Sequence, residues 1–151
     1  MARKIETAMV QTLRTLNVNR SGIVFSRDNT TVEIEHHGIY LTPSYEMIVK
    51  VKLHGSVICR YNRTLERVTF SDCGYQTATT KSRLNALLEY FSAYIKGGWS
   101  RYGIYQSKHV WYLQESSLRY TGPGKDSHPF VPLKPVEWPG ELTVSVSRNC
   151  P

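Results

Sequence analysis

Apolar side chains recur along the chain with two different periods, and the longer period predicts two amphipathic helices. Over about residues 79–96 the apolar positions lie three or four residues apart, which places them on one helix face: Leu84, Leu87, Leu88, Phe91 and Ile95. The same spacing predicts an N-terminal helix over residues 2–17, with an apolar face formed by Ile5, Met9, Leu13 and Leu16. A Ser-Gly pair at 21–22 would end that helix.

A period of two between these helices predicts strands. The clearest strand covers residues 46–53, where one face is formed by Met47, Val49, Val51 and Leu53. Shorter strands are expected over residues 31–35, 57–61 and 65–70, with turns at 54–55 and 62–63. Short turns between consecutive strands indicate an antiparallel meander, and the long helix that follows directly would cover one of its faces.

The last third of the chain predicts a hairpin and one more strand. Residues 102–106 and 109–114 would pair around a turn at 107–108, and alternating apolar residues after 141 predict the final strand. Residues 121–140 hold five of the seven prolines, so an irregular Pro/Gly-rich loop is expected there. We therefore expect a single α+β domain over residues 1–151, in which the two helices cover the meander.

The start of the long helix combines hydroxyls and cations. Thr79 or Thr80 is expected as the N-cap, with Lys81, Ser82 and Arg83 following in the first turn. The helix dipole makes a cation there unfavourable by ~0.3–1 kcal/mol. A bound anion would reverse that penalty, because free amides, hydroxyls and two cations would converge on it. The alternative is that both cations extend into water and the threonines only cap the helix.

The charge is concentrated in the middle of the chain. The formal net charge is +7, and residues 79–125 carry seven positive and two negative side chains, a net of +5. A positive field of this kind favours polyanions or phosphorylated small molecules as ligands. A net charge of this size is also ordinary for a soluble domain, so charge alone does not decide the question.

Aromatic and basic residues are mixed in the predicted hairpin, as base stacking and phosphate neutralisation would require: Trp99, Arg101, Tyr102, Tyr105, Lys108 and Trp111. The alternative is a normal hairpin with one face in the core. With a period of two, Tyr105 and the row of Trp111 and Leu113 would then point inward, leaving Arg101, Tyr102 and Lys108 at the surface.

No motif for catalysis or metal binding is present, so we expect neither an enzyme nor a cofactor. His36 and His37 are adjacent on a predicted strand and would point to opposite faces. None of the three cysteines belongs to a Cys-x-x-Cys pair, which argues against a zinc site or a disulfide framework. No apolar stretch is long enough to span a membrane and no signal peptide is evident, so a cytosolic protein is expected.

Several motifs together resemble a family of small tailed-bacteriophage proteins of unassigned function. They are residues 3–7, the Leu53-His54-Gly55 turn, the run of residues 75–86 with its Thr-Thr-Lys-Ser-Arg-Leu-Asn core, and Trp111-Tyr112. The resemblance covers residues 1–114; the additional strands around 23–41 and the Pro-rich tail depart from it. It implies a phage protein that acts in the cytoplasm of an infected bacterium, and it supplies no catalytic residues.

These observations lead to one main hypothesis and three alternatives. The main hypothesis is a non-enzymatic protein that binds DNA or RNA, with phosphate at residues 79–83 and stacking at residues 99–111. The first alternative is an inhibitor of a host defence protein, with the Pro-rich loop and exposed aromatic residues as its interface. The second is a protein that sequesters a small nucleotide signal at the helix start. The third is a minor virion component.

Overall fold

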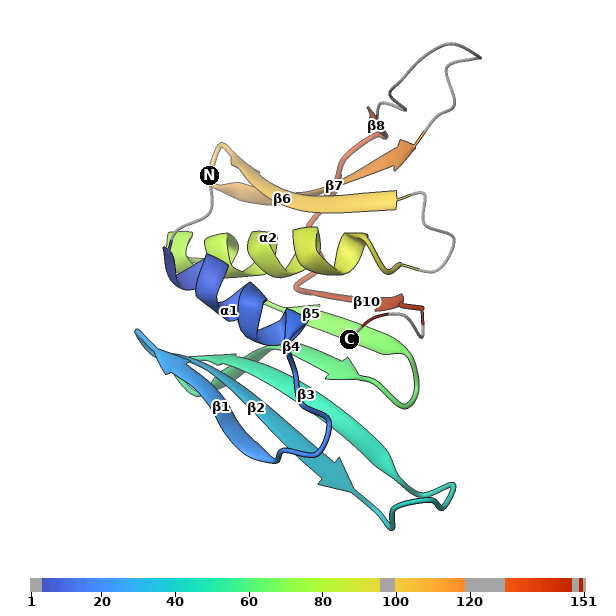
Figure 1. Ribbon diagram of the computed structural model, residues 1–151. Helices are drawn as coiled ribbons and strands as arrows, with labels where there is room; N and C mark the ends of the chain where they lie inside the picture. Colours follow the sequence, from blue (N-terminus) through green and yellow to red (C-terminus); the bar gives the residue numbers. More distant parts are fainter. Residues whose placement is uncertain (1–3, 96–99, 119–129, 148–149, 151) are drawn as a thin grey trace.

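Two antiparallel sheets enclose a layer of helices in the computed structural model, which describes residues 4–95, 100–118, 130–147 and 150. Helices α1 (Lys4–Arg14) and α2 (Ala78–Ser92) lie between the larger and the smaller sheet (Figure 1). The order of elements and the antiparallel pairing confirm the predicted α+β fold.

The larger sheet has six strands in the order β1-β2-β3-β4-β5-β10. Their bounds are β1 (Gly22–Arg27), β2 (Thr30–His37), β3 (Glu46–Leu53), β4 (Ser56–Asn62), β5 (Arg67–Ser71) and β10 (Glu141–Ser145). In the central register Val51 lies opposite both Val32 on β2 and Cys59 on β4, so apolar residues form a continuous row under the helices. The predicted final strand is β10, which pairs with β5.

The smaller sheet is built on the predicted hairpin, β6 (Ser100–Ser107) and β7 (Val110–Leu118). The turn is at Lys108 and His109, both with positive φ, one residue later than predicted. Two short strands also pair with β7: β8 (Phe130–Pro132) and β9 (Val136–Glu137). The expected loop at 121–140 therefore contains strand pairing at its end, and residues 121–129 lie outside the described part of the chain.

Helix α2 is the centre of the core because both sheets cover it. Phe91 packs edge-on against Tyr61, Phe70 and Tyr90, with ring centroids 4.9–5.9 Å apart. On its other side the smaller sheet contributes buried Ile104, Trp111 and Leu113. Full burial of each such side chain contributes about 1.5–3 kcal/mol relative to exposure.

Both ends of α2 differ from the prediction. The N-cap is Thr77, whose hydroxyl oxygen accepts from the amide of Thr80 at 3.1 Å, so neither Thr79 nor Thr80 caps the helix. The helix ends at Ser92, and Ile95 instead forms a bridge with Val146. Pairing with the C-terminal segment takes Ile95 out of the predicted apolar helix face.

Asp72 fixes the turn between β5 and α2. Its carboxylate accepts hydrogen bonds from the Gly74 amide at 2.8 Å, Gln76 Nε2 at 3.1 Å and Trp138 Nε1 at 3.0 Å. Its own amide donates to the carbonyl of Gly140 at 3.1 Å. The segment between the two sheets is thereby attached to the residues that precede α2.

Candidate functional site

The predicted anion site at the start of α2 contains a buried ion pair. Arg83 is 4% exposed and Glu6 of α1 is 2% exposed. Arg83 Nη1 donates to Glu6 Oε1 at 3.0 Å, and Arg83 Nε donates to the hydroxyl of Thr30 at 3.2 Å. The hydroxyl of Ser82 donates to the same Glu6 oxygen. The side chains of Ser82 and Arg83 therefore connect α1, α2 and β2 and are not directed to an external anion.

The position of Arg83 along the helix also differs from the prediction. Because α2 begins at Ala78, Lys81 closes its first turn, and Arg83 lies in the second turn, beyond the residues where the helix dipole penalises a cation. The guanidinium is neutralised by Glu6, as a buried charge requires. The predicted conflict between Arg83 and the helix dipole is therefore absent, and with it the argument that Arg83 needs an external anion.

The other residues of this predicted site have mixed environments. Thr80 is buried, and its hydroxyl lies 2.9 Å from that of Thr77. Thr79 and Lys81 are half-buried, and in the described part of the chain neither side chain has a hydrogen bond or ion pair. These two side chains are the part of the predicted site still available to a ligand.

A cleft of about 440 Å³ lies beside this helix start. Two of the motifs that carry the phage resemblance line it together, although they are more than twenty residues apart in sequence. Its lining residues are Leu53, His54, Ser56, Ile58, Asp72, Cys73, Tyr75, Thr77, Thr79 and Thr80. The thiol of Cys73 donates to the Val57 carbonyl at 3.0 Å, and the Asp72 carboxylate already accepts three hydrogen bonds. The Cys73 thiol and the Asp72 carboxylate are therefore both engaged in hydrogen bonds within the protein.

In the smaller sheet, Tyr105 has the opposite orientation to the one predicted. Asn85 of α2 accepts from the amide of Ile104 at 2.7 Å and donates to its carbonyl at 2.9 Å, which holds Ile104 toward the helix. Because side chains alternate along a strand, Tyr105 points outward and is 40% exposed, so its predicted inward orientation is wrong. Its ring stacks on Tyr112, with centroids 5.5 Å apart and an interplanar angle of 23°.

The remaining residues of the predicted hairpin site are divided between surface and core. Arg101 and Lys108 are exposed, and Trp111 is buried as predicted. Tyr102 was expected at the surface, but it shares the inward face with Ile104 and is half-buried, and burial and the neighbouring Glu115 raise its pKa. Trp99 lies outside the described residues.

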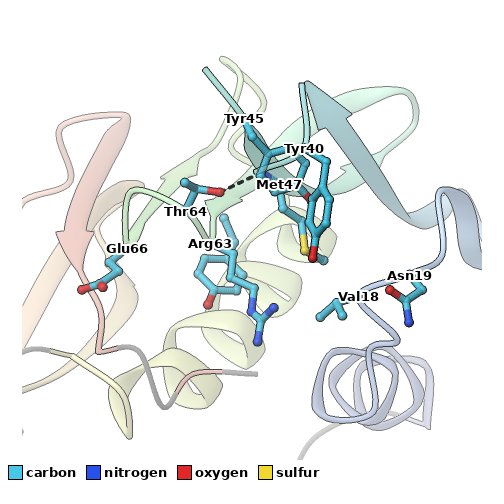
Figure 2. A pocket seen from close by; sticks show the side chains of 9 residues that line it. Val18, Asn19, Tyr40, Tyr45, Met47, Arg63, Thr64 and Glu66 are labelled. Carbon is cyan, nitrogen blue, oxygen red and sulfur yellow. Dashed lines mark hydrogen bonds between the residues drawn. The ribbon is translucent and has the colours of Figure 1, made fainter. Parts of the chain in front are cut away.

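A second cavity, of about 350 Å³, lies between segments that the sequence analysis did not connect. Figure 2 shows its lining residues: Val18, Asn19, Tyr40, Tyr45, Met47, Tyr61, Arg63, Thr64 and Glu66. They come from the loop after α1, the β2–β3 connection, strands β3 and β4, and the β4–β5 turn. Because its lining residues come from five elements, the cavity leaves no local signal in the sequence.

A comparison with family models shows to which protein family the chain belongs. The model described as Kyanoviridae Gp96 protein matches residues 2–131. The chain belongs to this family. The match confirms the expected phage protein family, and it extends beyond the residues on which the resemblance rested. Comparisons with curated proteins and with solved structures found no significant match.

The described residues form neither a metal cluster nor a membrane-spanning helix. Within residues 4–95, 100–118, 130–147 and 150, no three His, Cys, Asp or Glu side chains come together as a metal site would require. In the same part of the chain, no helix is both long and apolar enough to cross a membrane.

Proposed function

We propose that this phage protein binds single-stranded nucleic acid, without catalysis, on the outward face of the smaller sheet. The observation that carries the proposal is the stack of exposed Tyr105 on half-buried Tyr112, which has Arg101 at a same-face position of β6 and Lys108 at the adjoining turn. Exposed aromatic rings with nearby cations are the combination that single-stranded binding uses, because rings stack on bases while cations neutralise phosphates.

The spacing of these residues supports one continuous binding face. Arg101 and Tyr105 are four residues apart on one strand, so their Cβ atoms share a face at a separation of ~13 Å along the strand. The Arg101 side chain also borders a cavity formed with α1 and α2. Tyr112 is the cross-strand partner of Tyr105. A strand of nucleic acid that crosses β6 and β7 could stack a base on the tyrosines and place phosphates near both cations.

The start of α2 lies on the helix side of the smaller sheet and would add a second contact beyond this outward face. The β6–β7 turn and the first turn of α2 lie at the same end of the molecule (Figure 1). Lys81 is the cation there, it has no partner within the described residues, and it would contact the backbone of the nucleic acid. Arg83 has no part in the proposed interface because it is buried against Glu6.

Fluorescence anisotropy with labelled single-stranded DNA and RNA at low salt tests the proposal. Loss of both rings in Tyr105→Ala/Tyr112→Ala should weaken binding about 5- to 150-fold, which corresponds to about 1–3 kcal/mol for one stacked base. Lys81→Glu and Lys108→Glu should weaken it less and reduce its salt dependence.

Two control variants make this result specific. Tyr105→Phe/Tyr112→Phe should retain binding because the rings still stack. Tyr75→Ala removes a ring that is 63% exposed but lies in the cleft beside α2, and it should bind normally. Absence of binding at low salt, or equal losses in Tyr75→Ala and the double variant, would reject the proposal.

A second candidate function, contact with a host protein, is favoured by one observation. The β2–β3 connection exposes three adjacent large apolar side chains: Ile39 (70%), Tyr40 (71%) and Leu41 (85%). The turn is held by Thr42, whose amide and hydroxyl both donate to the Ile39 carbonyl, at 3.1 and 2.6 Å. Exposed apolar residues grouped on a firm turn are typical of an interface.

Affinity purification from infected cells, after nuclease treatment, tests this candidate. A bacterial protein recovered in stoichiometric amount with the wild type should be lost with Ile39→Asp/Leu41→Asp. It should be retained with Leu65→Asp, which changes another exposed leucine (51%) outside the β2–β3 connection. Recovery that is equal for all three proteins would show that these residues are not the interface.

A further inference from the structure

We infer that the cavity in Figure 2, which we call the tyrosine cavity, binds a small ligand that joins an aromatic ring to a negatively charged group, such as a nucleoside monophosphate. This site is separate from the outward face of the smaller sheet. The inference therefore does not depend on the proposed nucleic-acid binding.

Arg63 supplies the charge that selects an anion. Its backbone amide donates to the Met47 carbonyl at 3.0 Å, which fixes the start of the side chain at the β4–β5 turn. Figure 2 shows the guanidinium extending into the cavity toward Val18 and away from Glu66. Among the described residues its side chain has no hydrogen bond, and no ion pair joins it to Glu66. A half-buried guanidinium with five donors and no acceptor is suited to a phosphate or carboxylate.

Tyr61 does not compete for this cation. Its hydroxyl donates to the carbonyl of Cys150 at 3.1 Å, and burial raises its pKa, so it stays neutral. A ligand anion would supply the acceptor that Arg63 lacks among the described residues. This contrasts with Arg83, for which the protein provides Glu6.

The aromatic wall of the cavity is held in place before any ligand binds. The Tyr40 ring lies edge-on to Tyr45, with centroids 5.3 Å apart. The Tyr45 ring stacks on His36 at 5.9 Å, and the Tyr45 hydroxyl lies 2.6 Å from His36 Nδ1. His36 Nε2 donates to the Arg20 carbonyl at 2.9 Å, which ties the loop after α1 to the same wall. A fixed ring beside a cation lowers the entropy cost of binding a planar anion.

Polar groups at the rim could read the edge of the ligand ring. The Thr64 hydroxyl oxygen accepts from the Met47 amide at 2.9 Å, which leaves its own hydrogen to donate. The side-chain amide of Asn19 makes no hydrogen bond within the described residues. The volume of about 350 Å³ is near the lower end of the ~300–1,000 Å³ typical of small-molecule sites, which favours a mononucleotide over a larger ligand.

Titration calorimetry of the full chain tests the inference, with the four ribonucleoside monophosphates, their nucleosides and inorganic phosphate as probes. At least one monophosphate should bind, and both its nucleoside and phosphate alone should bind at least tenfold more weakly. Arg63→Gln should reduce the affinity about tenfold or more, because it removes a charge-assisted contact. Tyr40→Ala should reduce it several-fold through loss of ring contact.

Arg60→Gln is the matched control. Arg60 is an exposed arginine on β4, three residues before Arg63, and it lies on the uncovered face of the larger sheet outside the cavity. This variant should bind the monophosphate as the wild type does, and thermal unfolding should confirm that all variants are folded. Failure of all four monophosphates to bind at millimolar concentration would overturn the inference. So would equal losses in Arg63→Gln and Arg60→Gln, or a loss in Tyr105→Ala/Tyr112→Ala with none in Arg63→Gln.

Discussion

Arg83 and Arg63 occupy contrasting environments in one small protein. Arg83 is 4% exposed, and its guanidinium is satisfied by Glu6 and Thr30. Arg63 is half-buried beside three tyrosines, and no acceptor within the described residues approaches its guanidinium. The difference teaches that a cation in a suggestive sequence context is a weak indicator of a ligand. The acceptors that the fold already supplies decide whether the cation is available.

The largest expected effect comes from breaking the Arg83 pair. Glu6→Gln or Glu6→Ala leaves a buried guanidinium without its counter-charge, which should reduce the free energy of unfolding by about 3–5 kcal/mol. Chemical denaturation measures this change. Arg63→Gln is the comparison and should shift stability by less than about 0.5 kcal/mol, because its side chain has no hydrogen bond or ion pair to lose within the described residues.

A double variant sharpens the same comparison. Glu6→Leu/Arg83→Met removes both charges together and should recover much of the stability lost in Glu6→Ala, since neither partner is then left unpaired. If Glu6→Ala costs no more than Arg63→Gln, the pair does not hold α1 to α2. The case that Arg83 is unavailable to ligands would then fail.

A smaller loss is expected at Asp72, which ties the C-terminal segment to the start of α2. Asp72→Ala should lower the free energy of unfolding by about 1–3 kcal/mol, because Trp138 Nε1 is left buried without an acceptor. In Trp138→Phe that donor is already absent, so adding Asp72→Ala should cost less. Equal costs in both backgrounds would show that this hydrogen bond is not the source of the stability.

The sequence was most informative where hydrophobic periodicity is set by one face of one element. The meander, the hairpin and the apolar face of α2 up to Phe91 were predicted because each depends on local spacing. Ile95 was assigned wrongly because its position depends on pairing with Val146, more than fifty residues away. Tyr105 was assigned wrongly because hydrogen bonds between Asn85 and Ile104 decide which face of β6 meets the helix.

The candidate sites show the same limit. The residues at the start of α2 are consecutive, so a pattern search finds them, but it does not show that Glu6, 77 residues before Arg83, provides their counter-charge. The tyrosine cavity is formed by residues from five elements, and none of these elements has a distinctive motif alone. The tyrosines at 40, 45 and 61 and the arginine at 63 become a site only when the β2–β3 connection folds over the β4–β5 turn.

The smallest effect tests whether the start of α2 is closed or open to an anion. Thr77→Ala removes the acceptor for the Thr80 amide and should cost about 1 kcal/mol of unfolding free energy, whereas Thr79→Ala should cost less than about 0.5 kcal/mol. Equal costs would contradict Thr77 as the cap.

Denaturation repeated with increasing phosphate, at constant ionic strength, distinguishes a helix start that the protein's own groups close from one that is open to an anion. A closed start predicts the same stability at every phosphate concentration in Arg63→Gln and in Thr77→Ala/Arg63→Gln, which both lack the cation of the tyrosine cavity. A stability that rises with phosphate in these variants would mean that an anion binds at the helix start, because a ligand that binds only the folded state must stabilise it.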